Sequence, residues 1–205
     1  MQGYIININQ VKDEDLIVTI LTQNNCYTTY RFYGARHSVI NIGYKIDFEL
    51  ESNHKSNIYR LKDVLQIGYS WIVDNNKLYC WQRFIKLFYP HLKDVEDIDS
   101  FYFELLDNLV HKITKQNSKR AIIESYILLC KHEGRLHSDF VCLLCDKDID
   151  SIVSLVRGFF PVHGDCCYGK KFDLYQIKEL CEENGLMSFS DEDIEYIWLV
   201  LLQGL

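Results

Sequence analysis

Two short clusters of cysteine and histidine have the residue types and the spacing of a metal site. Cys142 and Cys145 form a CxxC motif, and after seventeen intervening residues a motif HxxCC runs from His163 to Cys167. Two such pairs of soft ligands, each closed by a short turn, can surround one zinc ion tetrahedrally. We predict one zinc ion per chain, held by Cys142, Cys145, His163 and Cys166, with Cys167 as the reserve ligand.

The zinc is expected to be structural, because four protein ligands leave no open position for a catalytic water. A redox-active CxxC would need a strand before it and a helix after it, and the acidic run at residues 146–150 gives little of that context. The sequence contains no phosphate-binding loop, nucleophile elbow or obvious acid-base pair. We therefore expect no catalytic residues and a protein that is not an enzyme.

The other four cysteines, Cys26, Cys80, Cys130 and Cys181, stand singly in apolar stretches, where cysteine behaves as a small buried hydrophobic residue. No charged-then-apolar leader opens the sequence, and no uncharged run approaches the ~20 residues of a membrane span. Unpaired thiols and a zinc site are typical of a cytoplasmic protein.

The first seventy residues predict a small β-barrel. Five short stretches are rich in β-branched and aromatic residues, and Asp, Asn, Gly and Ser turn formers separate them. This is the pattern of short strands. Five such strands, with a tight hairpin at residues 23–25 and a long connection at 34–43, favour a barrel of the oligonucleotide-binding type. The expected strands are residues 4–9, 16–22, 27–33, 45–51 and 58–67.

The charge of the chain is uneven. The net charge is −7 over 205 residues, but residues 26–62 hold six basic side chains against three acidic ones. Basic residues interleaved with aromatic rings suit single-stranded DNA, because cations follow phosphates and rings stack on bases. An ordinary solvated surface with tyrosines in the core is the alternative. The predicted DNA-binding residues of the barrel are Arg31, Arg36, Lys45, Arg60 and Lys62.

Beyond residue 70 the apolar spacing changes from two to near 3.6, which predicts helices. We expect a barrel domain over residues 1–70 and a helical domain over 71–205, with a zinc lobe inserted at about 138–172. Ser100, Ser118 and Ser190 are the expected N-caps, and Gly134 is an expected helix end. Residues 111–137 carry six basic side chains against two acidic ones, and this second patch predicts DNA contacts by Lys112, Lys115, Lys119 and Arg120.

Three segments resemble the opening of the bacterial RecO recombination mediators: GYII at residues 3–6, EDLIVTILT at 14–22 and RFYGAR at 31–36. That family often carries a CxxC near two thirds of the chain and a second cysteine pair some fifteen to twenty residues later. Here the second pair is replaced by HGDCC at residues 163–167, which leaves open which of its three side chains bind metal.

The resemblance implies a DNA repair and recombination mediator that binds single- and double-stranded DNA and anneals complementary strands. With its partner RecR, it would help to load RecA onto DNA coated by single-stranded DNA-binding protein, at the bacterial nucleoid. We expect the acidic C-terminal tail of that coating protein to dock at residues 112–135, where Ile122, Ile123, Tyr126 and Leu129 lie among basic residues.

Two other functions are kept as alternatives. A zinc-containing protein adaptor that binds no DNA would suit the net charge of −7. A metal-dependent nuclease would have to use the six acidic residues at 94–107, whose spacing fits no calcium loop.

Overall fold

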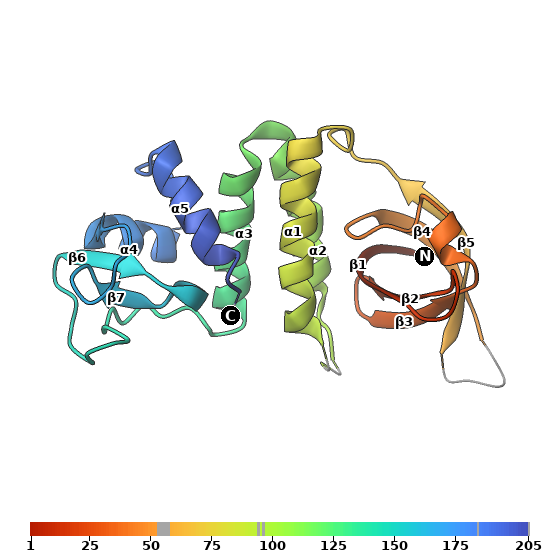
Figure 1. The fold of residues 1–205 in the computed structure, drawn as a ribbon, viewed down its shortest axis with the longest axis horizontal. Coiled ribbons are helices and arrows are strands. Elements are labelled where there is room, and N and C mark those ends of the chain that lie inside the picture. The colour runs from red at the N-terminus through yellow and green to blue at the C-terminus, as the bar shows by residue number, and fades with distance from the viewer. Residues whose placement is uncertain (53–57, 94, 96, 184, 205) are drawn as a thin grey trace. The chain divides into compact units, whose positions relative to one another are not determined.

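The computed structural model describes residues 1–52, 58–93, 95, 97–183 and 185–204 (Figure 1). The chain forms two compact units, residues 1–114 and 115–205. In these described residues, the first unit holds a barrel and two α-helices, and the second holds three α-helices and a small sheet. The change from strands to helices falls near residue 70, and the division of the chain into domains of residues 1–70 and 71–205 stays a prediction.

The N-terminal strands form a closed five-stranded barrel, as the sequence predicts. The barrel strands are β1 (Gln2–Gln10), β2 (Leu16–Leu21), β3 (Cys26–Arg31), β4 (Lys45–Glu51) and β5 (Tyr59–Ile67). They run in the spatial order β1-β2-β3-β5-β4. Four neighbouring pairs are antiparallel, and the pair β3·β5 is parallel.

The barrel interior is filled by alternate apolar side chains of these strands. Val18 and Ile20 of β2 and Ile46 and Phe48 of β4 are no more than 1% exposed. The β-branched and aromatic stretches and the turn formers between them are local features of the sequence, which is why the strands could be predicted. The expected fold class, a barrel followed by helices with an inserted Cys/His lobe, is confirmed.

Helix α1 (Asn75–Leu92) is fixed to the barrel at one glycine. The carbonyl oxygen of Gly43 accepts hydrogen bonds from Trp81 Nε1 and from the Tyr69 hydroxyl, both at 2.8 Å. Gly43 has a φ of +82°, and a Cβ there would lie 2.4 Å from Trp81 Nε1. Only glycine allows both this backbone conformation and this approach of the indole ring.

Helix α2 (Ser100–Lys115) completes the first unit, and α3 (Ser118–His132) opens the second. A side chain one residue before each helix caps it: Asp99 accepts from Phe101 N, and Asn117 accepts from Lys119 N and Arg120 N. The expectations that Ser100 and Ser118 are N-caps are therefore wrong, because both serines are already the first residues of their helices. Gly134, with a φ of +65°, follows the end of α3 as expected.

The second unit contains a small sheet that the sequence reasoning did not predict. The remaining elements are β6 (Ile152–Leu155), β7 (Pro161–His163), β8 (Phe172–Asp173), α4 (Leu174–Glu183) and α5 (Asp191–Leu201). The order of the strands in the sheet is β7-β6-β8, and both described pairs are antiparallel. Helix α5 follows the predicted cap Ser190, which forms a capping box with Asp193. Among the described residues, no helix combines the length and the apolar character needed to cross a membrane.

Candidate metal centre and nucleic-acid surface

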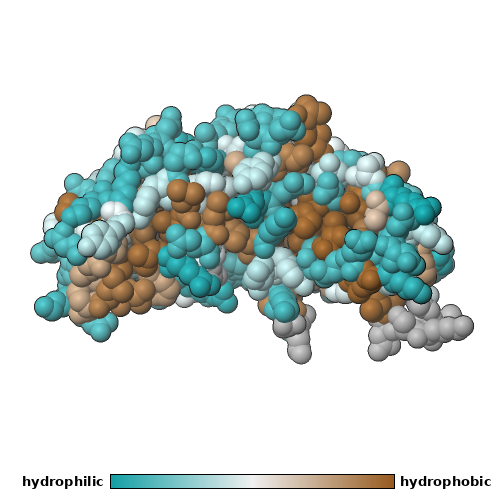
Figure 2. Space-filling view, viewed as in Figure 1, coloured by the Kyte–Doolittle hydropathy of each residue, from teal (hydrophilic) through white to brown (hydrophobic). Residues whose placement is uncertain are grey.

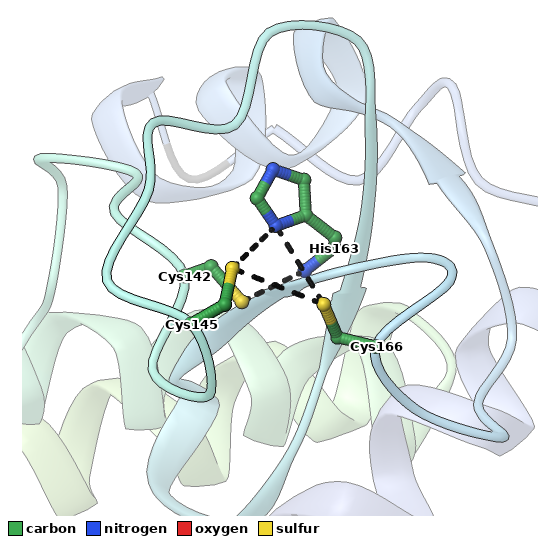
Figure 3. Close-up of side chains that lie close together, drawn as sticks. All are labelled: Cys142, Cys145, His163 and Cys166. Atoms are coloured by element: carbon green, nitrogen blue, oxygen red, sulfur yellow. Dashed lines mark hydrogen bonds between the residues drawn. The ribbon is translucent and has the colours of Figure 1, made fainter.

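Two turns bring Cys142, Cys145, His163 and Cys166 together (Figure 3). The first is closed by a hydrogen bond from Asp146 N to the Cys142 carbonyl oxygen, and the second by one from Cys166 N to the His163 carbonyl oxygen. One ligand atom from each of the four side chains lies within 4.8 Å of the other three. The four side chains that the sequence indicated therefore converge, although they come from two separate segments.

The distances fit a tetrahedral ion. Cys145 Sγ lies 3.4 Å from His163 Nδ1 and 3.9 Å from Cys166 Sγ, and Cys166 Sγ lies 3.9 Å from His163 Nδ1. Zinc–sulfur bonds of about 2.3 Å and zinc–nitrogen bonds of about 2.0 Å place tetrahedral ligands about 3.5–3.8 Å apart. The cluster could thus hold a metal ion of the size and preference of zinc with little movement.

The histidine ring is oriented by the backbone. His163 Nε2 lies 3.1 Å from the carbonyl oxygen of Asp148, which can only accept a hydrogen bond. Nε2 therefore donates this hydrogen bond, and in the neutral ring Nδ1 is the nitrogen left to bind a metal ion among the three sulfur atoms. A hydrogen bond to the second ring nitrogen commonly supports a metal-binding histidine in this way.

The surroundings of Cys142 and Cys166 shift the pKa values of these two thiols in opposite directions. Burial alone raises the pKa of Cys142, but hydrogen bonds, chiefly from the backbone N–H groups of His163 and Leu144, outweigh it and lower that pKa to about 6. Burial and the neighbouring Cys145 and Cys142 raise the pKa of Cys166 to about 11. Adjacent thiolates repel one another, so a cation between them would stabilise the fully deprotonated cluster.

Cys167, the predicted reserve ligand, does not belong to the four-residue cluster. It lines a separate surface hollow together with Asp165 and Tyr168. Its sulfur would lie 3.3 Å from a Cβ built on Gly169. The geometry therefore favours Cys166 over Cys167 as the fourth ligand.

In the barrel, the segments EDL and RFYGAR hold each other in place. The side chain of Asp15 accepts hydrogen bonds from the Tyr30 hydroxyl at 2.6 Å and from Tyr33 N at 2.7 Å. These bonds, first that of Tyr30 and then that of Tyr33, lower the pKa of Asp15. Gly34 permits the close turn, since a Cβ there would lie 2.8 Å from the Leu16 side chain. The second and third motifs of the RecO resemblance are thus one structural unit.

The barrel surface presents aromatic rings beside guanidinium groups. Among the large hydrophobic side chains that remain exposed are Phe32, Tyr33 and Tyr59, at 43–58%. The Arg60 guanidinium lies 4.5 Å from the centre of the Phe32 ring, and that of Arg36 lies 5.2 Å from the centre of the Tyr33 ring. Tyr59 and Arg60 belong to β5, whereas Phe32, Tyr33 and Arg36 lie in the segment that follows β3. The two groups are close because Tyr30 at the end of β3 is paired with Arg60 in the parallel pair.

Most predicted barrel cations have an acidic partner. Arg36 pairs with Glu14, and Arg60 and Lys62 both pair with Glu51. Arg31 is half-buried and donates from Nη1 to the carbonyl oxygen of Leu61 at 2.8 Å. The side chains of Arg36, Arg60 and Lys62 are 39–65% exposed, so a phosphate group can reach them.

Lys45 is placed differently from the other predicted barrel residues. Its side chain is only 15% exposed, and its Nζ lies 2.7 Å from Asp107 Oδ1 on α2. The ammonium group also lies 5.3 Å and 5.1 Å from the centres of the Tyr4 and Phe103 rings. Its contacts therefore link the barrel to α2.

The second predicted patch also contains internal contacts. Lys119 pairs with Glu195 of α5. Arg120 pairs with Asp191 at 2.9 Å and donates to the carbonyl oxygens of Leu186 and Phe189. Lys112 is half-buried and Lys115 is exposed.

The apolar residues that we expected in the partner pocket are buried instead. Ile122, Ile123, Tyr126 and Leu129 are each no more than 1% exposed. Charge and periodicity in the sequence could not distinguish these buried positions from exposed ones. Any pocket near α3 would therefore need other apolar residues.

Comparison with known proteins agrees with the sequence resemblance for the barrel. Residues 1–72 match the family model described as RecO N terminal. No curated protein matches the chain. The matched range contains the whole five-stranded barrel and both motif segments that hold each other at Asp15. The barrel is therefore similar to the RecO N-terminal domain, and this similarity supports a place for the chain in the RecO family.

Proposed function

We propose that this protein is a non-enzymatic mediator of DNA repair and recombination, of the RecO type. It binds single- and double-stranded DNA, anneals complementary strands and, together with RecR, assists the loading of RecA. The proposal rests on the barrel surface formed by Phe32, Tyr33, Arg36, Tyr59 and Arg60, where exposed rings lie beside cations within a RecO N-terminal domain. Such a surface follows phosphates and stacks bases without recognising their sequence.

Strand annealing needs a surface that holds DNA without enclosing it. The rings and cations lie on the outside of the barrel, whose interior is filled by its own side chains. Phosphate contacts of exposed arginine and lysine exchange quickly with salt ions, so a bound strand stays available for pairing. We place the protein in the bacterial cytoplasm with the nucleoid, where its DNA substrate would be.

The metal centre has a supporting role in this proposal. Zinc bound by Cys142, Cys145, His163 and Cys166 would join the turn before β6 to the turn after β7. With four protein ligands it would have no open position for a substrate, so it would stabilise the lobe. The C-terminal tail of single-stranded DNA-binding protein would dock on the helical part of the chain, near the cations of residues 112–135.

The DNA proposal is tested by titrating the purified chain with a fluorescent oligothymidine at several salt concentrations. Binding should weaken with salt, and Arg36→Gln with Arg60→Gln should lower the log-log slope by about 1.4, or about 0.7 for each lost phosphate contact. The matched control is Lys147→Gln with Lys178→Gln, which changes the net charge equally and lies outside the barrel.

If the wild-type chain binds no oligonucleotide at low salt, the mediator proposal fails. The chain would then fit the second candidate, a zinc-containing adaptor between proteins. The observation that favours this second candidate is the pairing of Arg36, Arg60 and Lys62 with acids of the same chain, which reduces the positive field of the barrel. The nuclease alternative would require magnesium-dependent strand cleavage, and two of its acidic positions, 94 and 96, lie outside the described residues.

A further inference from the structure

Helix α1 carries basic but no acidic residues, although the chain as a whole is acidic. Its eighteen residues, Asn75–Leu92, include Lys77, Arg83 and Lys86 but no aspartate or glutamate. The net charge of the whole chain is −7. The sequence reasoning had placed its two basic patches on either side of this helix and had assigned it no role beyond the core.

One stripe of the helix faces solvent. Tyr79, Arg83 and Lys86 are spaced i, i+4 and i+7, which places them on the same side of an α-helix. All three are exposed, and the Tyr79 side chain is 56% exposed. The opposite side of the helix carries Trp81 and Phe84, which are fully buried. The packing of α1 therefore leaves the stripe to water.

The ring and the guanidinium group of this stripe lie next to each other. The Arg83 guanidinium carbon is 5.7 Å from the centre of the Tyr79 ring. Lys86 follows one turn later, about 4.5 Å further along the helix axis. A ring beside a cation, with a second cation one turn away, repeats on a helix the chemistry of Phe32 with Arg60 on the barrel.

The two cations of the stripe differ from those of the barrel in their partners. Within the part of the chain that the structure describes, neither Arg83 nor Lys86 forms an ion pair with an acidic side chain. Arg36 and Lys62, in contrast, would have to release Glu14 and Glu51 to bind a phosphate group. Among the described residues, an anionic ligand at Arg83 and Lys86 would therefore displace no acidic side chain.

We propose that Tyr79, Arg83 and Lys86 of α1 form a binding surface for single-stranded DNA, with the two cations on successive phosphates and the tyrosine ring on an unpaired base. The inference rests on the proposed function and assigns part of it to a helix outside the barrel. The helix surface is convex and exposed, so it suits a flexible polyanion that bends over it. Single-stranded DNA is the matching form, because in a duplex the base faces are already stacked and closed to Tyr79.

The cations are tested by Arg83→Gln with Lys86→Gln in the full chain, measured with fluorescent oligothymidine across a salt series. Two lost contacts should reduce the log-log slope by about 1.4, which corresponds to about 25-fold weaker binding at 0.1 M salt. The control is again Lys147→Gln with Lys178→Gln, which should leave the slope unchanged. Both variants alter exposed positions, and their thermal unfolding is compared with wild type to verify that they fold.

The ring is tested by Tyr79→Ala and Tyr79→Phe. Loss of one stacked base should weaken binding about 5- to 150-fold, since stacking contributes about 1–3 kcal/mol per base. Phenylalanine keeps the aromatic face and should bind within about twofold of wild type. A duplex of the same length should lose less affinity than the single strand when Tyr79 is replaced by alanine.

The outcomes separate this inference from the function on which it rests. If wild type binds oligothymidine and Arg83→Gln with Lys86→Gln binds with the same slope, the α1 surface is refuted while the mediator function stands. If wild type does not bind at all, both proposals fall. If the double variant keeps its DNA slope but loses binding to a short acidic peptide, the surface belongs to a protein partner and the inference is wrong.

Discussion

Lys45 offers the sharpest test, because two expectations meet at one side chain. The basic patch of the sequence makes it a phosphate contact, whereas its 2.7 Å contact with Asp107 makes it a link between β4 and α2. Asp107 also accepts a hydrogen bond from the Tyr4 hydroxyl. Burial first, and then the neighbouring Tyr69 and Asp107, raise the pKa of Tyr4, so its hydroxyl stays protonated as a donor. Replacing Lys45 with methionine keeps the apolar stem and removes the charge.

The expected cost follows from exposure. Lys45 is 15% exposed and Asp107 is 37% exposed, so this pair is neither a surface pair worth about 0–1 kcal/mol nor a buried one worth about 3–5 kcal/mol when broken. Cation–π contacts with Tyr4 and Phe103 add about 0.5 kcal/mol each. Solvent at Asp107 screens part of the sum. We expect Lys45→Met to lower the free energy of unfolding by about 2 kcal/mol.

Urea unfolding of Lys45→Met, Asp107→Asn and the double variant measures this contribution. The two substitutions should be non-additive, with a coupling free energy of about 1–2 kcal/mol. The salt dependence of oligothymidine binding should change little. The reasoning is refuted if Lys45→Met loses less than about 0.5 kcal/mol and the binding slope falls by about 0.7, the value for one phosphate contact on a single strand.

Three other predictions concern the metal, pH and packing. Elemental analysis should show that Cys142→Ser reduces the zinc content from one ion per chain to near zero, whereas Cys167→Ser leaves it at one. Equal loss of zinc in both variants would contradict the assigned ligand set. Hydrogen bonds lower the pKa of Asp15, so its stabilisation is complete above its ordinary pKa of 3.8 and disappears as the pH falls through the lower folded value. The stability difference between wild type and Asp15→Asn should therefore shrink below about pH 4 in urea titrations, and a constant difference would argue against it. Gly43→Ala should lower the free energy of unfolding by at least about 2 kcal/mol, because φ is +82° and no space is left for a methyl group. The control is Gly68→Ala, where an added Cβ would have no atom within 4 Å. This control should change the free energy of unfolding by less than about 0.5 kcal/mol.

The barrel could be predicted from the sequence because its signals are local. The strands are stretches of six to nine residues rich in β-branched and aromatic side chains, and the turns between them carry their own residue types. The Cys/His cluster was equally accessible, since CxxC and HxxC spacing reports the turn geometry of each half. The halves are brought together by a hydrogen bond from Leu143 N to the Pro161 carbonyl oxygen and one from His163 N to Cys142 Sγ, contacts that neither motif shows by itself.

The rest depended on partners far away in the chain. The sheet of β6, β7 and β8 has strands of two to four residues, which are too short to show a period. The N-cap expected at Ser118 failed because Asn117 stands beside it and both residue types can cap a helix. Charge counts likewise could not show that Glu195 faces Lys119 or that Asp107 faces Lys45, because these acids lie more than sixty residues away in sequence.

The partners of a cation decide whether DNA can use it. An exposed ion pair such as Arg36 with Glu14 contributes about 0–1 kcal/mol, so a phosphate group can displace the acid at small cost. Arg120 is held more firmly, because it donates to two backbone carbonyl oxygens in addition to Asp191, and those acceptors would lose their donor. In the part of the chain that the structure describes, Arg83 and Lys86 form no ion pair that a phosphate group would have to displace. Affinity for DNA should therefore fall most for Arg83→Gln with Lys86→Gln, less for Arg36→Gln, and least for Arg120→Gln, whose main effect should be on the stability of the second unit.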